Sequence, residues 1–258
     1  MAFALAINHL IDAMKKTGCP ICRLYRESSQ RAIVSFLWEN VNDPQLRQGI
    51  IASYGFCSPH TRLMVASELS SSSTALGTNI IYEHLGRLLA GELSGLRPIR
   101  QTGTTAAPGG LGARLRTWLN QAGLLKSGRP LQPRGICPVC EAGSNAALNS
   151  LFVLCEELAK KGDVYSTYQS SDGVCLDHLR TGLGLHSDRF PEALRFILDD
   201  TITRLTQQSA HMKEYIRKNN WSYRDEKASE AEDTAWRKTL TFFTGYPSSA
   251  FTHKADEY

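Results

Sequence analysis

The same pattern of three cysteines and one histidine occurs twice in this chain at one constant distance. The first occurrence is Cys19, Cys22, Cys57 and His60, and the second is Cys137, Cys140, Cys175 and His178. Subtracting the positions (137 − 19, 140 − 22, 175 − 57 and 178 − 60) gives 118 each time, so no insertion or deletion separates the copies. Neighbouring residues match at the same offset: Pro20 and Pro138, Gly55 and Gly173, Arg62 and Arg180. The chain therefore contains an internal duplication.

The repeated residues are of the types that bind zinc. Six of the seven cysteines lie in the repeat, which is hard to explain if they only fill a core. A structural zinc ion takes four ligands in a tetrahedron, and three thiolates with one imidazole are an established set. The two ligand pairs of a copy are separated by residues 23–56 or 141–174. Either segment is long enough to form one helix that leads away from the first pair and a second helix that returns to it. Each copy is expected to close its own site, with Cys19, Cys22, Cys57 and His60 around one ion and Cys137, Cys140, Cys175 and His178 around a second.

Other occupants of these sites remain open at this point. Iron–sulfur clusters prefer four thiolates, so a histidine in both sites weakens that option without removing it. A metal-free dithiol switch of the thioredoxin type would need strands around the Cys-x-x-Cys motif, and the sequence predicts none. Four ligands leave no position for a reactive water, which indicates two structural zinc ions rather than catalytic ones. No Ser-His-Asp set, phosphate-binding glycine loop or His-Glu-x-x-His motif is recognisable.

The remaining cysteine and histidines lack a counterpart 118 residues away. Cys155 lies in the apolar run LFVLC and is interpreted as an ordinary core thiol. The other histidines are interpreted as surface or hydrogen-bonded side chains: His9, His84, His186, His211 and His253.

Length and composition indicate a soluble globular protein. The chain has 258 residues, 42% of them apolar and 21% charged, and it can bury a core without disulfides. No apolar stretch approaches the roughly 20 residues that span a bilayer. The first 16 residues lack a basic leader and place Asn8, His9 and Asp12 among apolar residues, so we expect a structural helix there and a cytoplasmic protein.

Hydrophobic residues recur at helical spacing along both copies, and no stretch alternates convincingly with a period of two. Helices are predicted over residues 2–17 and 22–41, and from Asp43-Pro44, where an N-cap residue precedes a proline, to Gly55. Others begin near residue 58, run through residues 81–89, and recur in the second copy up to a long helix ending near 219. We therefore predict an all-α protein. Its expected parts are a first module over 1–93, a basic linker over 94–118, a second module over 119–219 and a tail over 220–258.

Two segments fall outside this pattern. From Leu93 to Cys140 the chain has no acidic residue and seven basic ones: Arg97, Arg100, Arg114, Arg116, Lys126, Arg129 and Arg134. A basic stretch of this kind can contact nucleic-acid phosphates, but it holds one aromatic residue, Trp118, and a solvated linker is the competing explanation. The tail over 220–258 is first acidic and then amphipathic, with Trp236, Leu240 and Phe243, so we expect a helix that packs back on the body.

The segments GCPICRLY, VNDPQLR, GFCSPH and TALGTNIIYEHL carry a resemblance to a known family. Over about residues 15–90 the chain resembles a family of uncharacterised bacterial proteins with a CPxC … GFCxxH signature. The second copy departs from that signature at GVCLDH but keeps the ligand residues. The resemblance supports the duplication and the ligand assignment and implies no particular activity.

Closed metal sites without a reaction centre predict a non-enzymatic zinc-binding protein. In this interpretation zinc fixes helix pairs, and their outer surfaces bind another macromolecule, in the first instance a protein rather than a membrane. The alternative is a redox protein, either a thiol sensor that loses zinc on oxidation or an electron carrier with iron–sulfur clusters. A second alternative is a nucleic-acid-binding protein that uses the basic stretch over 93–140.

Overall fold

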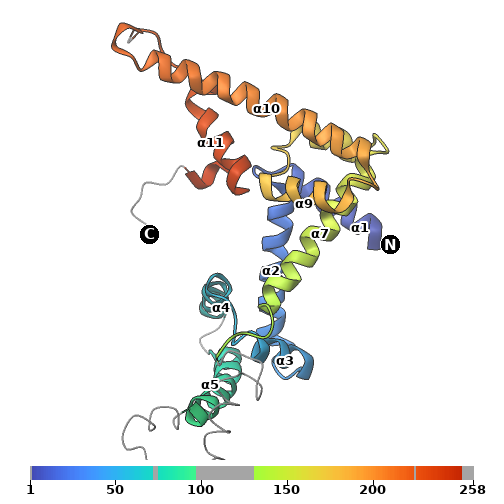
Figure 1. Cartoon of the computed structure of the whole chain (residues 1–258), viewed down its shortest axis with the longest axis vertical. Helices are drawn as coiled ribbons and strands as arrows, with labels where there is room; N and C mark the ends of the chain where they lie inside the picture. Colours follow the sequence, from blue (N-terminus) through green and yellow to red (C-terminus); the bar gives the residue numbers. More distant parts are fainter. Residues whose placement is uncertain (1, 72–74, 97–130, 224, 252–258) are drawn as a thin grey trace, which may run out of the picture. The chain divides into compact units, whose positions relative to one another are not determined.

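The structure is a computed structural model that describes residues 2–71, 75–96, 131–223 and 225–251 (Figure 1). These residues form α-helices and two short 3-10 helices, and none of them lies in a strand. The predicted all-α class is confirmed. The helices that precede the second copy are α1 (Ala2–Met14), α2 (Pro20–Trp38), α3 (Pro44–Ala52), α4 (Ser58–Ser71) and α5 (Leu76–Leu96). Those that follow are α7 (Pro138–Leu158), α8 (Asp163–Ser170), α9 (Leu176–His186), α10 (Pro191–Lys218) and α11 (Glu230–Thr244).

The order of the helices repeats with the sequence. Helix α7 begins 118 residues after α2 (138 − 20), and α9 begins 118 residues after α4 (176 − 58). In each copy a long helix that starts at the Cys-Pro-x-Cys motif is followed by a short helix and then by the helix that carries the histidine. The duplication seen in the sequence is therefore also present in the fold.

Local signals in the sequence explain where several helices begin. Asp43 caps α3, because its carboxylate accepts the Leu46 N–H at 2.8 Å and Pro44 occupies the first helical position. Helix α11 begins with a capping box, in which the Ser229 hydroxyl accepts the Glu232 N–H and the Glu232 carboxylate accepts the Ser229 N–H.

The chain divides into two compact units, and neither corresponds to one copy of the repeat. The N–C unit comprises Met1–Ser29 with Ala142–Tyr258, and the central unit comprises Gln30–Glu141. The unit boundaries fall inside α2 and α7, so each of these helices contributes residues to both units. The boundaries 1–93 and 119–219 from the sequence analysis thus describe the copies of the repeat rather than these compact units.

The core of the N–C unit joins the start of α2 to helices of the second copy. Ile21, which lies between the two cysteines of the first ligand pair, belongs to one buried cluster with Leu154 of α7 and Val174 before α9. Helix α1 packs on α8 in the same unit. Burial of these side chains fixes the start of α2 beside the start of α9.

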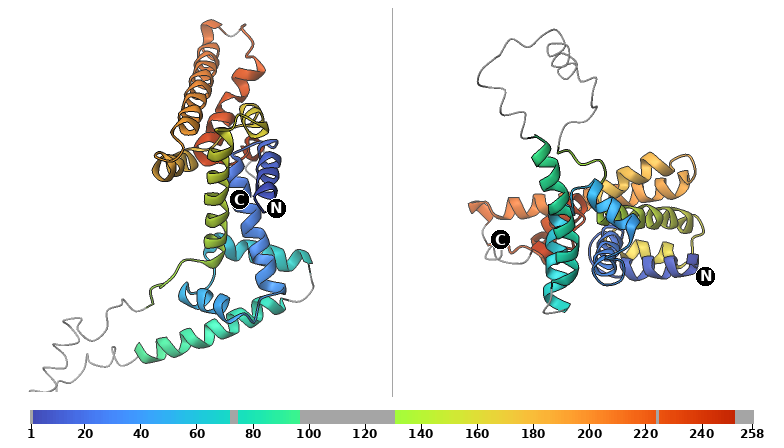
Figure 2. Two further views of the ribbon diagram at one scale, coloured as in Figure 1. Left: turned by 90° about the vertical axis from the view of Figure 1, so that its right-hand side faces the viewer. Right: turned by 90° about the horizontal axis from the view of Figure 1, so that it is seen from below.

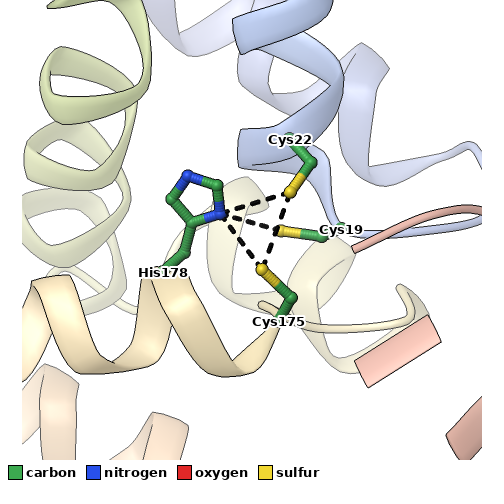
Figure 3. Close-up of side chains that lie close together, drawn as sticks. All are labelled: Cys19, Cys22, Cys175 and His178. Carbon is green, nitrogen blue, oxygen red and sulfur yellow. Dashed lines mark hydrogen bonds between the residues drawn. The ribbon is translucent and has the colours of Figure 1, made fainter. Parts of the chain in front are cut away.

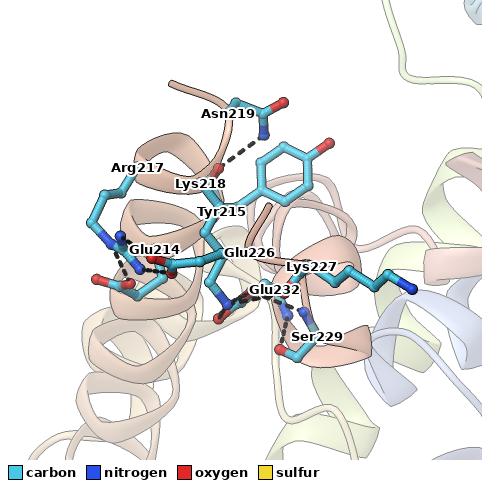
Figure 4. Close-up of polar contacts among 9 residues, drawn as sticks. All are labelled: Glu214, Tyr215, Arg217, Lys218, Asn219, Glu226, Lys227, Ser229 and Glu232. Atoms are coloured by element: carbon cyan, nitrogen blue, oxygen red, sulfur yellow. Dashed lines mark hydrogen bonds and ion pairs between the residues drawn. The ribbon is translucent and has the colours of Figure 1, made fainter. Parts of the chain in front are cut away.

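Helices α10 and α11 lie side by side as a hairpin (Figures 1 and 2). Ion pairs join the two helices and the turn between them: Lys218 with Glu232 at 2.8 Å and Arg217 with Glu226 at 2.5 Å (Figure 4). The predicted C-terminal helix is present. Its packing face differs from the amphipathic residues that suggested it.

The apolar residues that predicted α11 are exposed. Trp236, Leu240 and Phe243 have 41%, 36% and 53% of their surface accessible. The buried side of the helix is formed instead by Ala235, which is fully buried, and by Phe242, which packs on the core of the N–C unit. The expectation that the helix packs back on the body holds, but it does so through small and partly buried residues.

The central unit has its own core of residues from α2, α3, α4, α5 and the start of α7. Its buried members are Ile33, Leu37, Ile50, Phe56, Met64, Ile81, Cys137 and Val139. The buried carboxylate of Glu68 accepts the Thr78 N–H at 3.2 Å and so caps the first turn of α5. This core brings the start of α7 beside the start of α4.

Residues 97–130 of the basic stretch singled out in the sequence lie outside the described residues. Of its seven basic side chains, only Arg134 is described. No described helix combines the length and the apolar character that crossing a membrane requires.

Candidate metal centres

The eight repeated cysteines and histidines form two clusters of four. Site 1 consists of Cys19, Cys22, Cys175 and His178, and site 2 consists of Cys57, His60, Cys137 and Cys140. Within each cluster the candidate ligand atoms all lie within 4.8 Å of one another. Site 1 belongs to the N–C unit and site 2 to the central unit.

The prediction that each copy of the repeat closes its own site is wrong. Each site takes its Cys-x-x-Cys pair from one copy and its Cys-x-x-His pair from the other. Helix length explains the exchange, because α2 has 19 residues and rises about 28 Å, whereas α3 has nine and rises about 14 Å. The returning helix is too short to bring Cys57 back to Cys22. Helices α7 and α8, with 21 and eight residues, differ in the same way.

The four side chains of site 1 converge on a common point (Figure 3). The Cys22 and Cys175 sulfurs lie 3.6 Å apart. Nδ1 of His178 lies 3.2 Å from the Cys175 sulfur, 3.4 Å from that of Cys22 and 3.6 Å from that of Cys19. The imidazole thus faces all three sulfurs with the same nitrogen.

Site 2 repeats this geometry with the copies exchanged. The Cys57 and Cys140 sulfurs lie 3.6 Å apart. Nδ1 of His60 lies 3.2 Å from the Cys57 sulfur, 3.3 Å from that of Cys140 and 3.7 Å from that of Cys137. The two sites are therefore equivalent in ligand type, in ligand atom and in spacing.

These separations match the edges of a zinc tetrahedron. With zinc–sulfur bonds of about 2.3 Å and zinc–nitrogen bonds of about 2.0–2.1 Å, sulfur–sulfur edges are about 3.8 Å and sulfur–nitrogen edges about 3.6 Å. All seven cysteines of the chain are free thiols rather than disulfides. The residues present therefore fit a four-coordinate metal ion in each cluster.

Every ligand pair lies at the N-terminus of a helix. Cys19 directly precedes α2, and its carbonyl accepts the Arg23 N–H at 3.1 Å, while Cys22 lies in the first turn. Cys175 is the N-cap residue of α9, and His178 lies in the first turn of that helix (Figure 3). The N-termini of α4 and α7 lie at site 2 in the same way. Three thiolates and Zn²⁺ carry a net charge of −1, which the positive ends of two helix dipoles at each site stabilise.

Hydrogen bonds between the copies support the exchanged pairing. Beside site 1, the N–H of Gly18 donates to the carboxylate of Asp172 at 2.6 Å. Beside site 2, the N–H groups of Arg134 and Gly135 donate to the carbonyl of Ala52 at 2.7 and 3.1 Å. At both sites, the segment before the Cys-x-x-Cys pair is therefore hydrogen-bonded to the segment before the Cys-x-x-His pair.

The sequence matches a family of unknown function, DUF6062, over residues 4–249. The chain belongs to this family. The matched range includes both copies of the repeat and α11, so the exchanged sites and the C-terminal hairpin fall within one family unit. Comparisons with curated proteins and with solved structures gave no match.

Without a metal ion, the ligands of site 1 favour a thiolate beside an imidazolium. Hydrogen bonds from Cys19 and Cys22 hold the pKa of Cys175 well below its usual range, and the pKa of Cys22 is raised in return. Desolvation lowers the pKa of His178, but the Cys175 and Cys19 sulfurs outweigh it and raise that pKa to about 10. A metal ion held by these four residues would displace the proton of the imidazolium and those of the remaining thiols.

At site 2 the shifts have a simpler cause. Burial lowers the pKa of His60. Burial together with the Cys57 and Cys137 sulfurs raises the pKa of Cys140 to about 12. Both shifts favour the neutral side chains when no metal ion is bound.

The other candidate residues lie outside the two clusters. Cys155 is fully buried in the core of the N–C unit, where burial raises the pKa of its thiol to about 11, so the prediction of a core thiol is confirmed. Nδ1 of His84 accepts a hydrogen bond from the Arg47 guanidinium at 3.1 Å, and His186 packs edge-on against Phe152. His253 lies outside the described residues.

Arg204 is a positioning residue that the sequence did not indicate. Its guanidinium donates to the carbonyls of Gln169 and Ser171 at 3.2 and 2.5 Å, and it pairs with Asp200 at 2.7 Å. These contacts hold the segment that leads to Cys175. No motif marks Arg204, because it lies in the middle of α10 and acts on carbonyls 33 and 35 residues away.

Proposed function

We propose that this protein binds two structural zinc ions, one in each exchanged site, and uses them to lock the two copies of the repeat together. The geometry of the clusters carries this proposal, because three sulfurs and one Nδ1 atom lie at tetrahedral separations in both. Zinc fits better than an iron–sulfur cluster because each site offers one imidazole where clusters prefer a fourth thiolate. Four protein ligands leave no coordination position for a substrate or a reactive water.

The role that follows is that of a non-enzymatic interaction protein. The proposed zinc ions stabilise the start of four helices, and the outer faces of other helices remain free for a macromolecular partner. The exposed residues Trp236, Leu240 and Phe243 on α11 support a protein partner, because aromatic side chains dominate the energetics of protein interfaces.

Metal analysis of the purified full-length chain tests the proposal. Protein produced without added metal should contain two zinc ions per chain and show no absorbance in the visible range. Replacement of zinc by Co²⁺ should give the intense visible bands of tetrahedral thiolate coordination at both sites. A brown protein with iron and sulfide would contradict the zinc assignment, and a chain without bound metal would contradict the proposal as a whole.

A thiol redox sensor is the second candidate, and the pairing of Cys175 with His178 favours it. In the metal-free site the Cys175 thiolate lies 3.2 Å from Nδ1 of His178, and thiolates are the form that peroxide oxidises. Two thiolates of one site would give two electrons to hydrogen peroxide, which with two protons becomes two water molecules, and the disulfide formed would release zinc. Zinc release at stoichiometric peroxide, reversed by a thiol reductant, would distinguish this function from a purely structural one.

Nucleic-acid binding draws no support from the described residues. Residues 97–130 of the basic stretch that suggested it lie outside them.

A further inference from the structure

The segment Gly245–Pro247, here called the closing segment, lies directly against site 1. Gly245 ends α11 in a left-handed conformation with φ of 72°. A Cβ atom built on this residue would lie 2.3 Å from the sulfur of Cys22 and 3.3 Å from that of Cys175. Only a glycine therefore lets the chain pass so close to the cluster. Figure 3 shows C-terminal chain, red in the scale of Figure 1, next to Cys19.

Two further contacts hold the closing segment in place. The backbone of Pro247 packs against Gly18, where an added Cβ would lie 3.0 Å from the proline Cα. The guanidinium of Arg26 lies over the ring of Tyr246, 5.5 Å from its centroid. Gly18 precedes the Cys-x-x-Cys pair of site 1 and Arg26 follows it on α2. The closing segment thus contacts the chain both before and after the Cys-x-x-Cys pair of site 1.

Within the described residues, the corresponding place beside site 2 is exposed. The counterpart of Gly18 at the repeat offset of 118 is Ile136, and its side chain is 65% exposed. The residue equivalent to the one that Pro247 covers beside site 1 is therefore exposed beside site 2. The two sites have the same ligands and spacing but different surroundings.

We propose that the closing segment makes site 1 a slowly exchanging metal centre and leaves site 2 as the exchangeable one, which responds to metal supply or oxidants. This inference rests on the proposed function, because both sites must hold zinc. A chelator or oxidant must reach a sulfur atom, and at site 1 the closing segment must first lift away from Cys22. Such local opening costs free energy, so the open state is rarely populated. The exchange rate at site 1 is proportional to this small population and is therefore low.

Alkylation of the cysteines during chelation measures exchange at each site separately. The zinc-loaded full chain is mixed with a strong chelator and N-ethylmaleimide, sampled over time and digested with trypsin. Peptides 17–23 and 162–180 report on site 1, and peptides 48–62 and 135–160 report on site 2, with fragmentation separating Cys155 from its neighbours. The site 2 cysteines should be modified about tenfold faster than those of site 1 if opening costs about 1.4 kcal/mol.

Two variants test the role of the closing segment. In Gly245→Ala the new Cβ displaces the segment, so alkylation at site 1 should accelerate about tenfold and reach the rate of site 2. Because alanine is also strained at a positive φ, a chain that ends at Thr244 removes the segment without adding an atom, and it should show the same acceleration. Gly184→Ala is the matched control, since a Cβ there meets nothing within 4 Å in the same unit.

The outcomes separate this inference from the proposed function. Equal alkylation rates at both sites of the native chain, or an unchanged site 1 rate in both variants, would overturn the inference. If the chain still bound two zinc ions, the proposed function would stand. A chain that binds no zinc would overturn both.

Discussion

The sulfurs of Cys22 and Cys175 lie 3.6 Å apart although 153 residues separate them in the chain. Cys22 belongs to the first copy of the repeat and Cys175 to the second. Since site 2 joins Cys57 to Cys140 at the same distance, each copy supplies half of both sites. Metal binding would therefore tie the copies to each other rather than stabilise each copy alone.

Paired substitutions distinguish exchanged sites from sites closed within a copy. We expect Cys22→Ser combined with Cys175→Ser to remove one zinc ion, because both sulfurs belong to site 1. Cys22→Ser combined with Cys57→Ser should remove both ions, because it breaks one ligand in each site. Zinc content by elemental analysis after desalting is the measurement. Loss of only one zinc ion from the variant that combines Cys22→Ser with Cys57→Ser, both in the first copy, would contradict the exchanged pairing.

The sequence predicted the ligands but not their grouping, and the reason is the duplication itself. Because both copies carry the same ligand types at one offset of 118 residues, a Cys-x-x-Cys pair has two equivalent Cys-x-x-His partners. The choice depends on helix length and on the core packing of Ile21 with residues of the second copy, which is a tertiary property. By contrast, Asp43 and Pro44 act locally, so the start of α3 could be read from the sequence, whereas the helix ends at Ala52 rather than at Gly55.

The C-terminal helix shows a second limit. Trp236, Leu240 and Phe243 recur at helical spacing and correctly predicted a helix, but periodicity cannot tell an apolar face that packs from one that is exposed. The contact of Gly245 with site 1 left no signal beyond a glycine after a helix, which is also an ordinary C-cap.

Removal of both metal ions should destabilise the fold strongly. The free energy of metal binding contributes to folding, and each site joins segments distant in the chain. Treatment with a strong chelator is expected to lower the Tm by about 6–12 °C or more, if at least about 3 kcal/mol is lost at about 2–4 °C per kcal/mol. Differential scanning fluorimetry with and without chelator measures the shift, and added zinc should restore it. An unchanged Tm in fully metal-free protein would show that the sites are not structural.

Cys155 should behave unlike the other six cysteines. It is fully buried away from both sites, and burial raises the pKa of its thiol to about 11. We expect Cys155→Ala to retain two zinc ions and to lower the free energy of unfolding by about 1 kcal/mol, as for a small core truncation. Zinc content and urea denaturation measure these effects. Loss of one zinc ion from this variant would mean that Cys155 takes part in a site.

The ion pair between Lys218 and Glu232 should make the α10–α11 hairpin sensitive to acid. Hydrogen bonds from Lys218 and the Ser229 N–H hold the pKa of Glu232 below its usual range. Because this pKa is lower in the folded than in the unfolded chain, the ionised carboxylate stabilises the fold at pH values above the unfolded pKa of about 4.3. This stabilisation is lost as the pH falls through the lower pKa of the folded state. Lys218→Met should therefore lower the Tm at pH 7, and its difference from wild type should shrink below about pH 4.

The Tm difference between the two proteins, rather than either absolute Tm, is the quantity to follow, because acid also protonates the metal ligands. Lys213→Met on the same helix is the control, since Lys213 is exposed and forms no ion pair within the described chain. A difference for Lys218→Met that stays constant from pH 7 to pH 3 would show that the ion pair does not act through the Glu232 carboxylate.

Substitutions on the two faces of α11 should differ in their cost. Phe242 packs on the core of the N–C unit, so Phe242→Ala is expected to lower the free energy of unfolding by about 2 kcal/mol, less than for a fully buried ring. Trp236 is 41% exposed on a different face of the helix, so Trp236→Ala should cost about 0.5 kcal/mol or less. Urea denaturation of both variants measures the difference. If Trp236→Ala were the more destabilising change, the exposed aromatic face would have to be a packing surface of the folded chain, and its proposed role in binding a partner protein would be lost.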